Sequence, residues 1–395
     1  MKKHHTVPKA WKKKKSSLKK QLMKSQQLKL KQKHSTEQPA PIRKIIPLKN
    51  RKTRYFNNRR SRPWKLPLAL SFSVLLLLIL AIPALIVAFF GENSKLDSAS
   101  VEMEREETVE MESSPVSVAV MRSTVDTVED IPLETYVAGV VASEMPTEFE
   151  LEALKAQALA ARTFTVNHLL HGNQAANYDL TDTVQHQVYK SDHELQQEWG
   201  SAYTEKMSKI KEAVNATKGQ ILTYNDAPIT AAFFSTSNGY TENSEDYWEN
   251  ELSYLRSVES PWDIESPKYL GQQTFTISQI EELLELKLPK DSPLYIELDR
   301  TGSGRVSELG IEGYTFTGRE IREKLDLQSS DFSIKQNNGH LIFTTEGYGH
   351  GIGMSQYGAN GMAKEGKTYE EIVKYYYQDI DISTINEAVP ALVSR

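Results

Sequence analysis

Residues Leu133 to Phe164 read LETYVAGVVASEMPTEFELEALKAQALAARTF. The first half is a run of small apolar residues, and the second half opens a segment of helical periodicity that we expect to extend over Glu150–His171. Its five alanines permit close packing against neighbouring elements. The positions that fall on one stripe of such a helix are Leu151, Leu154, Ala158, Ala161, Thr165 and His168.

Glu144 stands between these two halves. Pro146 disfavours helical backbone at Met145, so Glu144 is expected near a turn that precedes the long helix. A carboxyl group held among Val, Ala and Met side chains loses hydration, which raises its pKa and makes it a usable acid near neutral pH. The alternative is an ordinary exposed glutamate near a helix N-terminus, where negative charge is favoured.

The rest of the chain predicts hairpins and short helices. A strand is expected over 116–123, and turn residues predict hairpins over 219–241, 295–313 and 332–347. Helices are expected over 278–286 and 317–327, and a closing helix over Tyr369–Tyr377. The fold class is therefore α+β, with mixed sheets built from antiparallel hairpins around a long Ala-rich helix, and not an alternating parallel sheet. The turns are expected at Asn225-Asp226, Gly302–Gly304 and Asn338-Gly339.

Charge divides the chain unevenly. It has 395 residues, a formal net charge of -5 and no cysteine, which excludes disulfides, thiolate metal sites and cysteine nucleophiles. Residues 1–65 hold 23 Lys/Arg and a single acid, whereas the remainder holds 24 Lys/Arg and 51 Asp/Glu. Between them, Leu68–Phe90 is an uncharged apolar run long enough to cross a hydrocarbon core of about 30 Å. A cleavable signal peptide is the alternative, although its apolar core is normally shorter and ends at small residues.

The basic flank of this run is expected to stay in the cytoplasm. The sequence thus predicts a basic disordered cytoplasmic tail over 1–65, a single transmembrane helix over 66–90, an acidic linker over 91–114 and an extracytoplasmic catalytic domain over 115–395. The tail either attracts anionic lipid or nucleic acid, or is a solvated segment that reinforces the topology. We expect no nucleic-acid partner.

A second unusual stretch, Glu346–Gly361, reads EGYGHGIGMSQYGANG and holds six of the twenty glycines. No frame in it fits GxGxxG and no GK[ST] follows, so nucleotide loops are excluded. Glycines permit backbone conformations that other residues avoid, and a long polymer could lie against such backbone. The side chains beside it would supply hydrogen bonds and a stacking face. The alternative is a purely structural loop that joins a strand to a helix near Ala359.

Two further patterns bear on the possible chemistry. His168 and His171 are three residues apart, but the HExxH pattern of metalloproteases is absent. The loop Ser235–Thr241, STSNGYT, lacks a GxSxG elbow, which argues against a serine nucleophile. Two interpretations of this loop remain: it binds sugar hydroxyls, or it simply forms a turn.

Segments 133–164, 233–245 and 347–377, taken together, resemble the stage II sporulation protein D family, which is related to amidase-enhancer domains. The resemblance spans roughly residues 115–385 in the family's order. It implies a peptidoglycan lytic transglycosylase, a lyase that cleaves bonds between N-acetylmuramic acid (MurNAc) and N-acetylglucosamine (GlcNAc) during endospore engulfment. Such enzymes prefer strands without stem peptides. The family's catalytic glutamate falls on Glu144, which would act as general acid and base and leave 1,6-anhydro-MurNAc ends.

The resemblance also implies a glycan groove, partners and a location. The partners are a cell-wall amidase and a multispan membrane scaffold of the engulfment machinery, at the sporulation septum. Some relatives hold zinc with cysteine and histidine; this chain lacks cysteine, so we predict no metal and no cofactor. The alternative function is a non-catalytic glycan-binding module that recruits or activates an amidase. The groove positions carried over from the family are Lys155, Gln157, Arg162, Ser235, Ser237, His350, Ser355, Gln356 and Tyr357.

Overall fold

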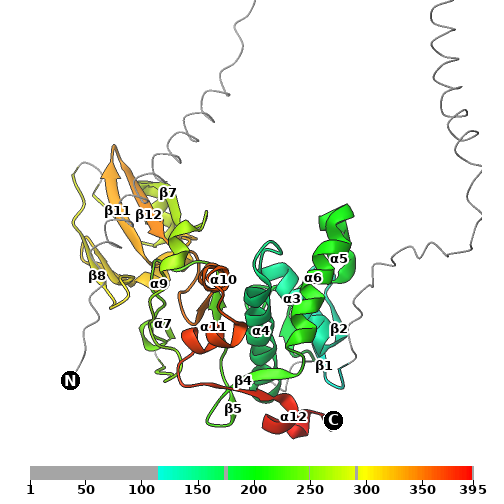
Figure 1. The fold of residues 1–395 in the computed structure, drawn as a ribbon. Coiled ribbons are helices and arrows are strands. Elements are labelled where there is room, and N and C mark those ends of the chain that lie inside the picture. Colours follow the sequence, from blue (N-terminus) through cyan, green and yellow to red (C-terminus); the bar gives the residue numbers. More distant parts are fainter. Residues whose placement is uncertain (1–113, 173–176, 249, 290–291, 394–395) are drawn as a thin grey trace, which may run out of the picture. The chain divides into compact units, whose positions relative to one another are not determined.

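The computed structural model describes residues 114–172, 177–248, 250–289 and 292–393 (Figure 1). No helix within these ranges combines the length and the apolar character needed to cross a bilayer. The predicted tail over 1–65, the predicted span over 66–90 and all but the last residue of the predicted linker over 91–114 lie outside the described residues.

Three helices, α3 (Leu133–Glu144), α4 (Leu151–His171) and α6 (Tyr203–Ala216), lie side by side (Figure 1). The predicted long helix is confirmed and begins one residue later than expected. The prediction of a single apolar stripe was incomplete, because buried residues lie all round α4. Two other helices and a strand also pack against it, and a helix covered on every side has no polar face to show.

A buried ion pair ties this layer together. Arg162 on α4 is fully buried, and its Nη2 lies 2.7 Å from Glu134 Oε2 on α3. The same guanidinium donates to the backbone carbonyls of Val214 and Gln220, and Glu134 accepts from the Gly219 N–H. The pair thus joins α3 and α4 to α6 and to the turn after it, and removing one partner would leave a buried charge.

The strands of the described residues form five small sheets, with orders β2-β1-β3, β10-β9-β8, β11-β12-β7, β13-β6 and β14-β4-β5. The three predicted hairpins are confirmed as antiparallel pairs β4–β5, β8–β9 and β11–β12. Two short pairs, β1–β3 and β6–β13, are parallel, so the sheets are mixed as expected. The strands are β1 Ser117–Arg122, β2 Thr127–Pro132, β3 Leu180–Thr181, β4 Gln220–Tyr224, β5 Ala227–Pro228, β6 Phe233–Phe234, β7 Leu270–Thr276, β8 Ile296–Arg300, β9 Val306–Ile311, β10 Tyr314–Thr317, β11 Phe332–Asn337, β12 His340–Glu346, β13 Met354–Ser355 and β14 Asp381–Thr384.

Local turn and cap chemistry explains most of these boundaries. The β11–β12 turn places Asn338 and Gly339 at φ 47 and 73, the left-handed conformations that a two-residue hairpin turn requires. Thr276 and Thr317 close capping boxes at the starts of two predicted helices. The remaining helices are α5 Asp192–Trp199, α7 Glu245–Trp248, α8 Ile277–Leu283, α9 Gly318–Lys324, α10 Gln356–Lys364, α11 Tyr369–Tyr376, α12 Ile385–Ala388 and α13 Pro390–Val393, with short 3-10 turns η1 Gly200–Ala202 and η2 Pro261–Glu265.

The apolar side chains gather into two main cores. One is built on α3, α4, α6 and α11, and the other on β7 to β12 with α8 and α9. The prediction that the chain closes with the helix ending near Tyr377 was wrong. Three elements follow that helix, and the first of them, β14, pairs antiparallel with β4.

Candidate active site

Glu144 is the last residue of α3. The helix ends there because Met145 adopts extended backbone, with φ -124 and ψ 135, ahead of Pro146. The Glu144 side chain is half-buried, and its Oε1 accepts a hydrogen bond from the Val188 backbone N–H at 2.8 Å. The expected turn between Glu144 and the long helix is therefore confirmed.

The surroundings of Glu144 favour the protonated form of its carboxyl group. Burial raises the pKa of the Glu144 carboxyl above its usual value, and the Val188 N–H and the positive charge of Lys268 offset only part of that rise. Two turns earlier on α3, burial and then the Glu144 charge raise the pKa of the Tyr136 phenol. A carboxyl that stays protonated to higher pH than in water is suited to donate a proton.

The glycine stretch runs from the end of β12 to α10 and packs on the segment that contains β6. Gly353 has φ 76, and a Cβ added there would lie 2.1 Å from the Ala232 carbonyl oxygen. Gly347 has φ 85, and its Cβ would lie 2.8 Å from the Thr236 carbonyl oxygen. At these positions the glycines allow two segments of the protein to approach each other. The interpretation of their backbone as a surface left open for a polymer is corrected accordingly.

Asp263 on η2 joins the two loops that the sequence singled out. It is completely buried, and its carboxylate accepts hydrogen bonds from the hydroxyls of Ser237 at 2.8 Å, Ser355 at 2.5 Å and Ser260 at 2.5 Å. Burial raises the pKa of Asp263 to about 6, against the opposing effect of the three hydroxyls. The Ser260 hydroxyl also meets that of Tyr376 at 2.7 Å. Asp263 therefore fixes the Ser235–Thr241 loop and the glycine stretch to each other.

His350 lies in an aromatic box. Its ring centre is 5.7 Å from that of Phe234, 6.0 Å from Tyr247 and 5.8 Å from Trp248. Its Nδ1 accepts from the Ile352 N–H at 2.9 Å, and the ring also bonds to the Phe233 backbone. Burial, then three nearby arginines, lower the pKa of His350 to about 3. So low a pKa favours the neutral ring at physiological pH, which makes His350 unsuited to serve as the acid of the site.

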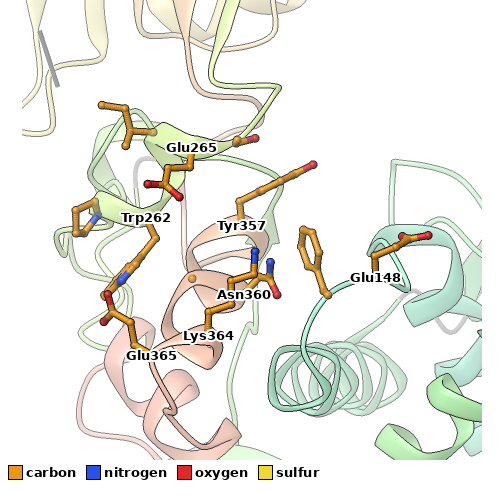
Figure 2. Close-up of a pocket in the computed structure, with 12 residues that line it drawn as sticks. Glu148, Trp262, Glu265, Tyr357, Asn360, Lys364 and Glu365 are labelled. Atoms are coloured by element: carbon orange, nitrogen blue, oxygen red, sulfur yellow. The ribbon is translucent and has the colours of Figure 1, made fainter. Parts of the chain in front are cut away.

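A cavity of about 560 Å³ opens beside the turn that follows Glu144. Figure 2 shows Tyr357 and Asn360 of α10 between Trp262 of η2 and Glu148 of that turn. Phe149, in the same wall, packs edge-on against Tyr357 with ring centres 4.9 Å apart. Glu144 does not line this cavity; it ends α3, four residues before Glu148. The lining residues are Glu148, Phe149, Pro261, Trp262, Ile264, Glu265, Ser266, Tyr357, Asn360, Gly361, Lys364 and Glu365.

The structure separates the predicted groove residues into two groups. Gln157, Arg162, Ser237 and Ser355 have no exposed surface. Their side chains are enclosed by the protein, so for these four the structure favours a supporting role over contact with a glycan strand.

Gln356 is almost fully buried, and its Nε2 donates to Gln157 Oε1 at 3.4 Å. Lys155 pairs with Glu152 at 2.7 Å and is partly exposed, as are Ser235 and Tyr357. Tyr357 is the predicted residue that the structure places in the cavity wall.

Lys268 and Tyr348 complete the surroundings of the acid. Lys268 is exposed on the loop between η2 and β7, and its Nζ lies 5.2 Å from the ring centre of Tyr348 in the glycine stretch. Tyr348 is 40% exposed, which is high for a ring of this size. The charge of Lys268 also lowers the pKa of Glu144. One cation therefore acts on the candidate acid and contacts Tyr348 of the glycine stretch.

Comparison with known proteins identifies the family of the chain. A family model described as "Stage II sporulation protein" matches residues 121–224, from β1 to β4. Stage II sporulation protein D of Bacillus subtilis (strain 168) is 50% identical over 328 residues, which cover 80% of this chain and 95% of that protein. The chain belongs to the stage II sporulation protein D family. The resemblance stated from the sequence is thus confirmed.

Two further relatives show how far the family extends. Stage II sporulation protein D of Bacillus amyloliquefaciens is 52% identical over 277 residues, 69% of this chain and 80% of that protein. The protein named amidase enhancer of Bacillus subtilis (strain 168) is 29% identical over 297 residues, which cover 60% of this chain and 39% of that protein. The chain is therefore a member of a family of sporulation proteins with a more distant relative among the amidase enhancers.

Sequence reasoning on this sporulation family member missed Asp263, Lys268 and Tyr348. Asp263 lies in the segment SPWDIESP, where an acid between two prolines resembles an exposed loop residue. Nothing in the sequence singled out Lys268, because its electrostatic effect on Glu144 depends on a fold that brings together residues more than one hundred positions apart. In the sequence, Tyr348 is an aromatic residue between two glycines, and the exposure of its ring became apparent only in the structure.

Proposed function

We propose that the chain is a membrane-anchored lytic transglycosylase that cleaves peptidoglycan between MurNAc and GlcNAc during endospore engulfment, with Glu144 as the catalytic residue. The observation that carries the proposal is the half-buried Glu144 carboxyl, whose pKa burial raises, at the end of α3. Its preferred substrate is a glycan strand without stem peptides.

One carboxyl group suffices for this reaction. Glu144 first donates its proton to the glycosidic oxygen as the bond to the anomeric carbon breaks. The C6 hydroxyl of the same MurNAc then attacks the anomeric carbon, and the Glu144 carboxylate takes the hydroxyl proton. The product is a 1,6-anhydro-MurNAc end, and Glu144 is protonated again. Hydrolysing glycosidases, by contrast, need a second carboxylate to activate water or to form a covalent intermediate.

The surrounding residues would support this chemistry. The Val188 N–H holds one carboxyl oxygen at 2.8 Å and so fixes the direction in which the acid points. Tyr348 and Tyr357 offer aromatic faces to sugar rings. We place the anchor at Leu68–Phe90 and the catalytic part outside the cytoplasm at the sporulation septum, with a cell-wall amidase and a multispan membrane scaffold as partners.

The second candidate is a glycan-binding module that recruits or activates an amidase without cleaving glycan itself. The observation in its favour is the similarity to the protein named amidase enhancer.

The test is to incubate the full-length chain, purified in detergent, with peptide-free glycan strands and to measure 1,6-anhydro-MurNAc ends by mass spectrometry. Removing a general acid costs about 10²–10⁴-fold in rate, so Glu144→Gln is expected to lose at least a hundredfold. Glu205→Gln, an exposed glutamate on α6, is the matched control and should retain wild-type activity. Undiminished activity in Glu144→Gln would reject Glu144 as the catalytic residue. An inactive wild type that still stimulates an amidase would establish the second candidate.

A further inference from the structure

Lys268 is an exposed cation on the loop between η2 and β7. Among the described residues, none places a carboxylate within ion-pair distance of its Nζ. Its own contacts are a backbone N–H that donates to Ser266 Oγ at 3.1 Å and the face of Tyr348 under its ammonium group. The ammonium protons that point away from the ring are therefore left for water or a ligand.

The position of Lys268 relates it to the candidate acid. The loop that holds it also supplies Ser266, which lines the same cavity as Phe149, five residues after Glu144. Ser266 is in turn bonded to Thr236 at 2.9 Å, so the loop is fixed rather than free to swing away. The cation therefore contacts the glycine stretch through Tyr348 and acts electrostatically on Glu144 at the end of α3.

The chemistry of the substrate supplies an anion for this cation, if the proposed function holds. In intact peptidoglycan the lactyl group on C3 of MurNAc ends in a neutral amide to the stem peptide. Hydrolysis of that amide consumes one water, breaks the C–N bond and leaves a lactyl carboxylate on the sugar and an ammonium group on the released peptide. A peptide-free strand therefore carries a negative charge on the same ring whose C1 takes part in cleavage.

We infer that Lys268 and Tyr348 form a subsite that recognises the lactyl carboxylate of peptide-free glycan. Lys268 Nζ donates charge-assisted hydrogen bonds to the carboxylate, and the Tyr348 ring lies against the sugar. A stem-peptide amide offers no charge to this lysine and adds bulk beside it, so the subsite binds one form and disfavours the other. This inference rests on the proposed function and explains its preference for stripped strands by two named side chains.

Binding can be measured without cleavage. The full-length chain with Glu144→Gln is titrated with peptide-free strands and with the same strands after coupling their lactyl carboxylates to methylamine, which removes the charge with little bulk. The dissociation constant is expected to be about tenfold lower for the carboxylate strands, since hydrogen bonds to charged groups contribute at that level. This difference should shrink with added salt.

Variants then assign the difference to Lys268. Adding Lys268→Gln should abolish the preference and leave binding of the methylamide strands unchanged, and Lys268→Arg should keep the preference. Lys287→Gln, an exposed lysine beside the other core, is the matched control and should behave as its parent.

Three results would overturn the inference: equal affinity for both strands, no binding of either, or a preference that survives Lys268→Gln. The proposed function fails by a separate result. A wild-type chain that shows the charge preference but generates no anhydro ends would retain the subsite and reject the catalysis.

Discussion

Replacing Asp263 by asparagine tests whether a buried charge holds the two loops together at neutral pH. The three serine hydroxyls that donate to Asp263 compensate only part of its burial, and the pKa is raised from 3.8 to about 6. At 1.36 kcal/mol for each pKa unit, ionising this group in the folded protein costs about 3 kcal/mol.

The sign of the pH dependence follows from this shift. A carboxyl group whose folded pKa lies above its unfolded pKa stabilises the fold fully below the unfolded pKa, and that contribution is lost as pH rises through about 6. Between pH 5 and pH 8 the wild-type chain therefore loses about 1.4 kcal/mol through Asp263. Asp263→Asn cannot ionise and escapes this loss, so its stability relative to wild type should rise by the same amount over that range.

The assay is urea unfolding at pH 5, 6 and 8, followed by tryptophan fluorescence, to which the adjacent Trp262 contributes. Asp299→Asn changes an exposed aspartate on β8 and serves as the control, with a smaller pH-dependent difference expected. Other titrating groups cancel when each variant is compared with wild type at the same pH. A difference between Asp263→Asn and wild type that stays constant from pH 5 to pH 8 would refute the reasoning.

Three further changes follow from the described contacts. Arg162→Met should lower the free energy of unfolding by about 3–5 kcal/mol, because it leaves its buried carboxylate partner without compensation; calorimetry measures the loss. Gly353→Ala should cost about 2–4 kcal/mol in urea unfolding, whereas Gly313→Ala, at a similar φ but with nothing within 4 Å, should cost less; equal costs would mean that close approach is unimportant. On peptide-free strands, kcat/KM should fall as pH rises through the raised pKa of Glu144, which must enter the reaction protonated. Lys268→Gln should move that fall to higher pH, because the lysine charge lowers this pKa; an unmoved profile would separate Lys268 from the acid.

The hairpins and helix starts could be predicted because their causes are local. Asn338-Gly339 specifies its turn by the φ values that these two residues accept, and Thr317 closes a capping box with a residue three positions on. The extent of α4 was equally visible, but its complete burial was not. Alanine fits both an exposed and a buried helical position, so the composition of α4 left open how many neighbours cover it.

The site was predictable only in part, because its contacts join distant segments. Glu144 could be singled out by its apolar neighbours and the following proline. Val188 and Lys268, which partly offset the effect of burial on its pKa, lie far along the chain. The alternating glycines indicated an unusual backbone. They gave no indication that the Ala232–Ser237 segment packs against it and that Ser237 and Ser355 bind a buried carboxylate instead of a ligand.

The hydrogen bond from the Glu150 N–H to Asn360 Oδ1, at 2.9 Å, joins residues 210 positions apart beside the candidate acid. During synthesis, the turn after Glu144 therefore emerges from the ribosome long before α10 exists to support it. The strand β4 likewise lacks its partner until β14, near the end of the described chain, has been synthesised. A chain interrupted before Asn360 would carry Glu144 and the turn after it without the α10 side of the neighbouring cavity. Any activity that depends on both sides of this cavity therefore requires a chain translated through α10.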